Sequence, residues 1–388
     1  MKPYEEFIEK MLNATRASQG QSPAAATEII QQALRSAGLL QPTEGTAQDA
    51  PAQQFVDLNE APAWARKWQA PEHGAEAVRD WAARFMPKGP GHARPGHERP
   101  GRQAADEPGQ FLSGSFSAEA GSRNYRLYVP AHKAEGAPAL VVMLHGCQQN
   151  PEDFAAGTRM NALAEKSGCL VLYPEQARSA NGSNCWNWFE TPHQQRALGE
   201  PAIIAGMTRE VMREHGIDPG RVYVAGLSAG GAMAAILGAT YPDLYAAIGV
   251  HSGLPVGSAH DLMSALNAMK GARKKRHGAR PERPLPAIVF HGDQDATVHP
   301  SNGQAVLRQF APTTPLRQVE DRGEGGAGRG YTRTSTLDDA GRVVTEHWTV
   351  HGAGHAWSGG STAGSYADPA GPDASSEMLR FFLAQPPR

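Results

Sequence analysis

The chain has 388 residues and a formal net charge of −2 at pH 7. This length is enough for one large enzyme domain with an appendage, or for two modest domains. The near-neutral charge argues against a nucleic-acid-binding protein, whose surface carries a clear basic excess. A local basic cluster at 270–280 lies between predicted structured segments. We interpret it as a solvated loop or helix end rather than a phosphate-binding patch.

The beginning of the chain lacks the pattern of a secretion signal, because charged side chains interrupt its apolar windows (Glu5, Glu6, Glu9 and Lys10). No stretch approaches the ~18 apolar residues that a membrane-spanning helix needs. The chain as given is therefore expected to be soluble and cytoplasmic, with no transmembrane segment, unless an upstream signal has been trimmed away.

The three cysteines, Cys147, Cys169 and Cys185, include no CxxC pair. This argues against a cysteine-based zinc site and against a dense disulfide framework. A single disulfide bridge between two of them is still an open alternative.

The first forty residues carry two short amphipathic helical patterns, at 4–12 and 29–37. The second follows Ser22-Pro23 and ends at Gly38, the usual placement of proline and glycine at helix ends. Helices this short need a surface on which to dock. We favour docking on the main domain or on a second subunit over an adhesive stripe for a hydrophobic surface.

The sequence predicts three regions: a helical extension (1–40), a flexible linker rich in Pro and Gly (41–110), and a packed domain (111–388). In the last, strand-like runs alternate with helical patterns, which predicts an α/β fold with a mainly parallel sheet covered on both faces. The predicted strands are 126–129, 140–144, 170–173, 222–225, 246–251 and 288–291. The predicted helices are 155–166, 202–215, 229–240 and 302–310. A hairpin (331–336 with 342–350) and a closing helix (374–383) complete the domain.

The sharpest motif is Gly226-Leu-Ser228-Ala-Gly230, which joins an apolar strand directly to an alanine-rich helical pattern. This is the nucleophile elbow of α/β-hydrolases: the serine sits on a strained turn, and the glycines let neighbouring backbone pass without Cβ clashes. The motif is weak alone, but its position between a strand and a helix makes Ser228 the candidate nucleophile.

A serine nucleophile needs a histidine base and an acid that orients it, in the chain order Ser, Asp, His. The loop after the 288–291 run offers Asp293 and Asp295, and the loop after the 342–350 run offers His351 and His355. We favour Asp295, because Asp293 can bond within its own turn. We favour His355, because it lies farther out in a glycine-flanked loop.

The acidic loop also carries two histidines, His291 and His299, so a divalent metal site is an alternative. Their spacing matches no zinc-hydrolase signature, and a serine triad makes a metal unnecessary. We therefore expect no metal and no cofactor.

The oxyanion formed in ester hydrolysis needs preorganised N–H donors. One is the amide after the nucleophile, here Ala229, and the other comes from the loop after an early strand. The His145-Gly146-Cys147 turn follows the 140–144 run, which makes the Cys147 amide the second expected donor.

Several segments together resemble the esterase family of poly(3-hydroxybutyrate) depolymerases, which is related to feruloyl and acetylxylan esterases. The resemblance spans about 114–383, with the motifs in the right order. They are LHGCQ from Leu144, YPEQ from Tyr173, CWNWF from Cys185, GLSAGG from Gly226, HSGLP from His251, FHGDQDATV from Phe290 and GHAWSGG from Gly354.

By this resemblance the nucleophile is Ser228, the acid Asp295, the base His355, and the oxyanion loop contains Cys147. It also implies a surface cleft lined by aromatic side chains, for which Trp186, Trp188 and Trp357 are candidates, with core packing as the alternative for each. Family members often bridge the cysteine of the His-Gly-Cys motif to a later one, which implies a Cys147–Cys185 disulfide. Such a bridge is at odds with a reducing cytosol.

The resemblance implies ester hydrolysis, with poly(3-hydroxybutyrate) or its oligomers as the favoured substrate. The alternative is a carboxylesterase acting on small or carbohydrate-linked esters, of the feruloyl or acetylxylan type. The N-terminal extension looks similar to those of intracellular depolymerases that act on storage granules, so a hydrophobic granule surface is a further expected partner. An extracellular location, as in many family members, and a granule-binding protein with a vestigial hydrolase domain are the remaining alternatives.

Overall fold

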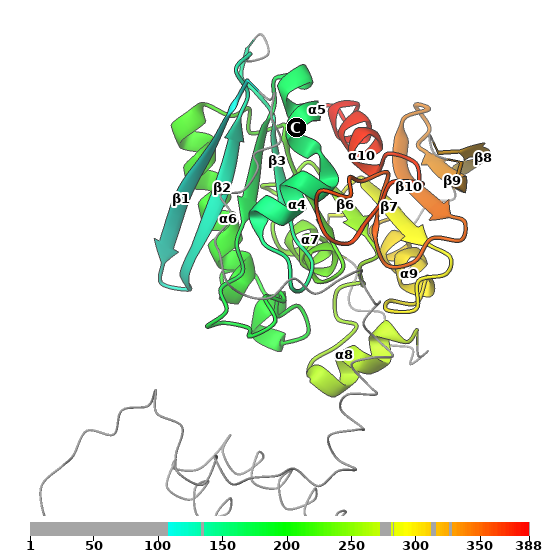
Figure 1. Ribbon diagram of the computed structural model, residues 1–388, viewed down its shortest axis with the longest axis horizontal. Helices are drawn as coiled ribbons and strands as arrows, with labels where there is room; N and C mark the ends of the chain where they lie inside the picture. The colour runs from blue at the N-terminus through cyan, green and yellow to red at the C-terminus, as the bar shows by residue number, and fades with distance from the viewer. Residues whose placement is uncertain are drawn as a thin grey trace, which may run out of the picture. The chain divides into compact units, whose positions relative to one another are not determined.

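The computed structural model describes residues 108–132, 136–271, 281, 283–311, 316–325 and 328–387 (Figure 1). The predicted extension (1–40) and the predicted linker up to residue 107 lie outside the described residues, as does 272–280 of the basic cluster, so these interpretations stay predictions. The first strand begins at Gln110, close to the predicted start of the packed domain.

The described part of the chain forms a ten-stranded sheet in the order β1-β2-β4-β3-β5-β6-β7-β10-β9-β8. The strands from β4 to β10 along this order are parallel, and β1, β2, β9 and β8 extend the two edges in antiparallel fashion. The strand bounds are β1 Gln110–Ala118, β2 Gly121–Val129, β3 Leu140–Leu144, β4 Leu170–Pro174, β5 Val222–Leu227, β6 Ala247–His251, β7 Ala287–Gly292, β8 Arg317–Glu324, β9 Gly330–Leu337 and β10 Val343–Val350. A separate parallel pair joins β11 (Trp357–Ser358) to β12 (Ala367–Asp368).

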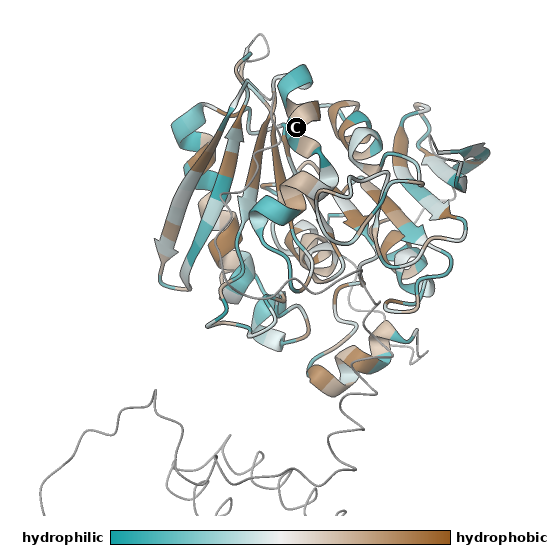
Figure 2. Ribbon diagram, viewed as in Figure 1, coloured by the Kyte–Doolittle hydropathy of each residue, from teal (hydrophilic) through white to brown (hydrophobic). Residues whose placement is uncertain are grey.

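The central strands β3 to β7 are buried at every position because both faces of the sheet are covered. In β3, for example, Leu140, Val142 and Leu144 enter one hydrophobic core, and Val141 and Met143 enter the other. Figure 2 shows hydrophobic residues concentrated on these strands and on the helix faces turned toward them.

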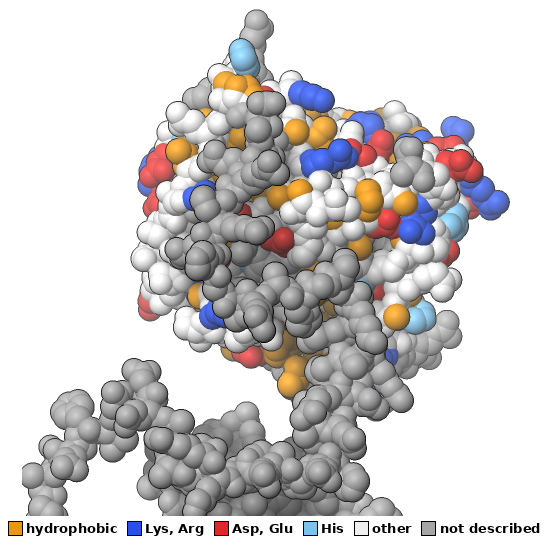
Figure 3. Space-filling model, in the orientation of Figure 1, with side chains coloured by type: hydrophobic (Ala, Val, Ile, Leu, Met, Phe, Trp, Pro, Cys, Tyr) orange, Lys and Arg blue, Asp and Glu red, His pale blue; other side chains and the backbone are white. Residues whose placement is uncertain are grey.

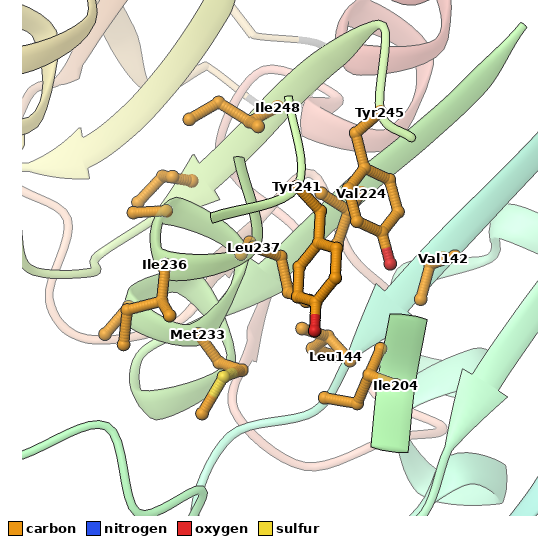
Figure 4. Packing of buried hydrophobic residues seen from close by; sticks show 14 of the residues in the cluster. Val142, Leu144, Ile204, Val224, Met233, Ile236, Leu237, Tyr241, Tyr245 and Ile248 are labelled. Atoms are coloured by element: carbon orange, nitrogen blue, oxygen red, sulfur yellow. The ribbon is translucent and has the colours of Figure 1, made fainter. Parts of the chain in front are cut away.

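Helices cover both faces of the sheet. Side chains of α6 (Gly199–His215), α7 (Ala229–Thr240) and α9 (Ser301–Phe310) pack in the first core, and those of α4 (Pro151–Thr158), α5 (Met160–Ser167) and α10 (Ala374–Leu383) pack in the second. Figure 4 shows Met233, Ile236 and Leu237 of α7 packed among strand residues and Ile204 of α6. The fold is therefore an α/β-hydrolase fold, with the sheet and its two helical layers as the rigid support of the loops.

Two short elements lie outside these layers. A 3-10 helix, η1 (Thr191–Gln194), precedes α6, and α8 (Leu262–Met269) follows β6. The side chain of Asp261 caps α8 by accepting a hydrogen bond from the Ser264 amide.

The strand-and-helix alternation predicted from the sequence is confirmed, and α7 and α10 begin and end where predicted. One predicted helix, 155–166, is wrong as a single element: the chain breaks at Arg159, whose φ of 55° is left-handed, and forms α4 and α5 instead.

Strands β1 and β8 and helix α8 were not predicted. The sequence of β1 is rich in serine, and β8 is an exposed edge strand of alternating charge that carries no apolar pattern. Figure 3 shows Lys, Arg, Asp and Glu side chains intermixed at this edge of the molecule, on the right. Charged edge strands resist pairing with other chains. The same charged residues leave β8 without the hydrophobic alternation by which a strand is predicted from sequence.

Candidate active site

Four loops meet at one edge of the sheet because β5, β6, β7 and β10 run parallel and are neighbours. Ser228 follows β5, His251 ends β6, and Asp295 lies beyond β7. His355 lies beyond β10. The carboxyl edge of parallel strands is the usual place of ligand sites in α/β folds.

Ser228 occupies the strained turn that the elbow motif predicts, with φ 57° and ψ −117°. Its amide donates to the carbonyl of His251 at 2.9 Å, and its own carbonyl accepts from the Ala232 amide at 2.9 Å. A Cβ on Gly230 would overlap the carbonyl of Leu144, and one on Gly226 would overlap Gly230 itself. Both glycines are therefore required by the close approach of β3 to the elbow.

Asp295 and His355 form a buried pair: His355 Nδ1 lies 2.7 Å from Asp295 Oδ2. The other carboxylate oxygen, Oδ1, accepts the amides of Thr297 at 2.9 Å and Val298 at 2.8 Å. Burial by itself raises the pKa of Asp295, but hydrogen bonds from His291 and His355 outweigh it and lower the pKa below its ordinary value. The carboxylate is therefore ionised, oriented and aimed at the imidazole.

The alternative residues form a second pair nearer the surface. His351 Nδ1 lies 3.0 Å from Asp293 Oδ2, and Asp293 Oδ1 accepts the Gly352 amide at 2.7 Å. The other ring nitrogen of His351 lies 2.9 Å from Thr332 Oγ1 on β9. Because both nitrogens are engaged and the side chain is 48% exposed, this pair fastens two loops together.

The described residues include no hydrogen bond between Ser228 Oγ and His355, whose Nε2 has no bonding partner within the same part of the chain. Two contacts connect their loops through His251, whose carbonyl binds the Ser228 amide and whose Nε2 accepts the Ser358 amide at 3.0 Å. Catalytic hydrogen bonds of this kind often tighten only when substrate is bound.

The two expected oxyanion donors lie in the loop after β3 and at the start of α7. Within the described chain, neither the Cys147 amide nor the Ala229 amide has a hydrogen-bond acceptor, whereas Gly146 N donates to Gln149 Oε1 at 3.0 Å. An amide without an acceptor at a helix N-terminus is suited to hold an anion.

A disulfide joins Cys147 to Cys185, and Cys169 is a buried free thiol. The Gln148 amide donates to the carbonyl of Ser183 at 2.8 Å, and Trp186 Nε1 donates to the carbonyl of His145 at 3.1 Å. A third hydrogen bond runs from Asn184 Nδ2 to the carbonyl of Gln149 at 3.4 Å. The loop after β3 is therefore held against the 183–186 segment by one covalent bond and three hydrogen bonds.

The 183–186 segment is in turn anchored by Glu200, a fully buried carboxylate at the start of α6. Its two oxygens accept the Asn187 amide at 2.8 Å and the Asn187 side chain at 2.9 Å, and Gln176 Nε2 lies 2.5 Å away. Sequence reasoning missed Glu200, because an acid in the first turn of a helix is ordinarily a solvated partner of the helix dipole. No local signal distinguishes the two situations.

The expectation that three tryptophans expose their faces in a cleft is corrected. Trp186 is 0% exposed, Trp357 1% and Trp188 6%, and all three belong to the hydrophobic cores. Trp357 stacks on His251 with ring centroids 5.1 Å apart and donates from Nε1 to Ser375 Oγ at 3.0 Å. The core-packing alternative therefore describes these side chains: their large rings are packed in the interior, and the N–H groups of Trp186 and Trp357 are hydrogen-bonded there.

The residues considered for a metal have other partners, although His291 Nε2 also lies 3.4 Å from Asp295 Oδ2. Asp293 binds His351, Asp295 binds His355, and His299 Nδ1 lies 2.9 Å from Ser301 Oγ. The described part of the chain contains no group of three or more His, Cys, Asp or Glu side chains arranged to hold a metal ion. Among the helices described, none has the length and apolar character needed to cross a bilayer.

We predict that the Cys147–Cys185 bridge stabilises the domain. It closes a separation of 38 residues, so the chain-entropy model gives a loss of about 4 kcal/mol in the free energy of unfolding on reduction. Urea unfolding with and without a phosphine reductant measures this. The double variant Cys147→Ser/Cys185→Ser is the control and should not respond to reductant. Equal unfolding curves for the oxidised and reduced wild type would contradict the prediction.

We predict a loss of stability in mild acid from two buried histidines, His145 and His251, and from the half-buried His347. Burial lowers the pKa of His145 to about 4, of His251 to about 3 and of His347 to about 4, from an ordinary value of 6.5. Below pH 6.5 the unfolded chain binds protons that the native chain does not. Each histidine therefore removes about 1.4 kcal/mol of unfolding free energy per pH unit, between pH 6.5 and its native pKa. Urea unfolding at pH 7, 6 and 5 tests this, and the variant His347→Phe should show about a third less pH dependence.

The family model described as esterase PHB depolymerase matches residues 123–330, more than half of the chain. The poly(3-hydroxyalkanoate) depolymerase C of Paucimonas lemoignei is 32% identical over 252 residues, which are 62% of this chain and 60% of that protein. A probable acetylxylan esterase A of Aspergillus fumigatus is 30% identical over 207 residues, 48% of this chain and 53% of that protein. The chain thus spans a little over half of the length of these curated relatives.

Among solved structures, an acetyl xylan esterase from Aspergillus awamori has a TM-score of 0.54 at 19% identity and covers 70% of this chain and 99% of its own. This likeness shows a shared α/β-hydrolase fold. With the elbow, the sheet order and a family match over more than half of its residues, the chain belongs to the esterase family of PHB depolymerases.

Proposed function

We propose that the chain is a serine esterase that hydrolyses poly(3-hydroxybutyrate) or its oligomers. The observation that carries this proposal is the buried Asp295–His355 pair at the same sheet edge as Ser228 on its strained turn. Family membership and the names of the relatives support an ester as the substrate.

In the proposed reaction, Ser228 Oγ attacks the ester carbonyl carbon while His355 Nε2 takes the hydroxyl proton. The amides of Cys147 and Ala229 hold the oxyanion of the tetrahedral intermediate. His355 then gives its proton to the leaving alkoxide, and the acyl group stays on Ser228. A water that His355 deprotonates attacks this acyl-enzyme and releases the acid. Asp295 keeps the imidazole in the required tautomer and stabilises its charged form.

A second candidate is a carboxylesterase that acts on small or carbohydrate-linked esters. The similarity to acetylxylan esterases and to a feruloyl esterase favours it, because two of these relatives are 30% and 29% identical over 48% of the chain. Both candidates use the same residues and differ only in what the site admits.

The test uses amorphous poly(3-hydroxybutyrate) granules and a soluble short-chain ester, with wild type and Ser228→Ala side by side. Clearing of granules and release of 3-hydroxybutyrate by wild type alone supports the polyester. Turnover of the soluble ester alone would contradict the polyester as substrate and support the small-ester candidate. Turnover of neither by a folded protein would contradict both candidates and favour a binding protein.

We also propose a granule surface as a partner and a cytoplasmic, granule-associated location, with an extracellular location as the alternative. The Cys147–Cys185 bridge favours the alternative, since the cytosol keeps thiols reduced. Cell fractionation followed by thiol labelling of the purified protein separates the two.

A further inference from the structure

The Asp295 carboxylate is contacted by a second histidine. His291, the next-to-last residue of β7, is 1% exposed. Its Nε2 lies 2.8 Å from the carbonyl oxygen of Val298 and 3.4 Å from Asp295 Oδ2. A carbonyl oxygen only accepts, so Nε2 carries the proton and donates it to Val298, with Asp295 Oδ2 next to the same N–H at 3.4 Å.

The other ring nitrogen of His291 has no such partner. Nδ1 is buried and makes no hydrogen bond within the described part of the chain. Gly303 of α9 lies over it, and a Cβ there would come within 2.8 Å of Nδ1. An unsatisfied buried nitrogen is costly, and a phenyl ring would fill the same volume without that cost. Packing therefore does not account for an imidazole here, whereas its Nε2–H does.

Four donors surround the buried carboxylate. Oδ1 accepts two amides of its own loop, from Thr297 and Val298, and Oδ2 is shared by His355 and His291. The amides fix one oxygen only, so rotation of the carboxylate is opposed at Oδ2 by His291. The carbonyl of Val298 is tied to the same N–H, which fastens the acidic loop to the end of β7.

We propose that His291 is a positioning residue of the triad, which holds Asp295 Oδ2 where His355 Nδ1 needs it. The inference rests on the proposed function, in which Asp295 orients His355. It requires no change in the protonation of His291. The titratable groups that face it are Asp295 and His355 from the loops, His251 from β6 and His347 from β10.

The test compares His291→Phe with His291→Gln. Phenylalanine keeps the ring volume and removes the donor, so kcat for a soluble ester should fall about ten- to a hundredfold with KM changed less than about threefold, because misorientation of a catalytic group costs this much. Glutamine places an amide N–H near the position of Nε2 and should restore most of kcat. The low-field proton resonance of His355 Nδ1–H should weaken or shift in the phenylalanine variant and return in the glutamine variant.

His347→Phe is the matched control. His347 is a half-buried histidine on the neighbouring strand β10, whose buried Nε2 has no partner in the described part of the chain and which makes no contact with Asp295. Its kcat should stay within about threefold of wild type, the scale of a small loss of packing.

Three results would overturn the inference: full kcat in a folded His291→Phe, an equal loss in both His291 variants, or an equal loss in His347→Phe. The failure of the proposed function looks different. If Ser228→Ala keeps the esterase activity, the triad itself is wrong, whatever His291 does. If no ester is cleaved, the His355 resonance still reports whether His291 orients the pair.

Discussion

Replacing Ser228 with alanine is expected to lower kcat for ester hydrolysis by about 10⁵- to 10⁶-fold, the loss seen when the serine of a triad is removed. The oxyanion amides and the Asp295–His355 pair remain, but no acyl-enzyme can form. Alanine carries the same Cβ at the strained φ of 57°, so the fold is kept. Steady-state turnover of a soluble ester measures the effect, and thermal unfolding checks that the variant is native.

The chain offers a matched serine for this experiment. Ser252 directly follows the neighbouring strand β6 and has a φ of 50°, and its Oγ lies 3.2 Å from His251 Nδ1. Ser252→Ala removes one neutral hydrogen bond worth about 1 kcal/mol, so its kcat should stay within about tenfold of wild type. A Ser228→Ala enzyme as active as Ser252→Ala would remove Ser228 from the mechanism.

Replacing Asp295 with asparagine is expected to lower kcat by about 10⁴-fold, because an amide at this position selects the wrong imidazole tautomer. The amides that bind Oδ1 and the packing of the loop are compatible with the isosteric side chain. The kcat should fall by this factor while the free energy of unfolding changes little. Pre-steady-state acylation of Ser228 by a chromogenic ester measures the acylation step separately.

Asp293→Asn is the control for this variant, since the two acids are two residues apart in one loop. Asp293 pairs with His351 at the surface, where an ion pair contributes at most about 1 kcal/mol. Its kcat should remain within about fivefold of wild type. If Asp293→Asn is the inactive variant and Asp295→Asn is not, the acid has been assigned to the wrong pair.

The elements that were predicted well are those whose pattern is written within a few consecutive residues. The all-apolar run of β3 requires a strand with both faces covered. Gly226 and Gly230 reveal the elbow because each fulfils a local steric need. Strand β8 gave no such signal, since a charged edge strand is paired on one side only and buries little.

The residues of the candidate site also fall into those that local sequence predicts and those that only the tertiary structure determines. Ser228 is recognisable from its own flanking residues, and so are the two acid and histidine candidates that follow β7 and β10. Which acid meets which histidine depends on loops 60 residues apart, where Asp295 and His355 are withdrawn from water together. The burial of Glu200 and the contact of His291 with Asp295 were not predicted, and the sequence offered His291 only as a possible metal ligand. The three tryptophans are the opposite case: the sequence suggested that they line a cleft, but they are buried in the hydrophobic cores. A side chain loses its water only when the whole interior has assembled. The sequence by itself therefore identifies the candidate reactive residues, and tertiary packing determines which of them come into contact.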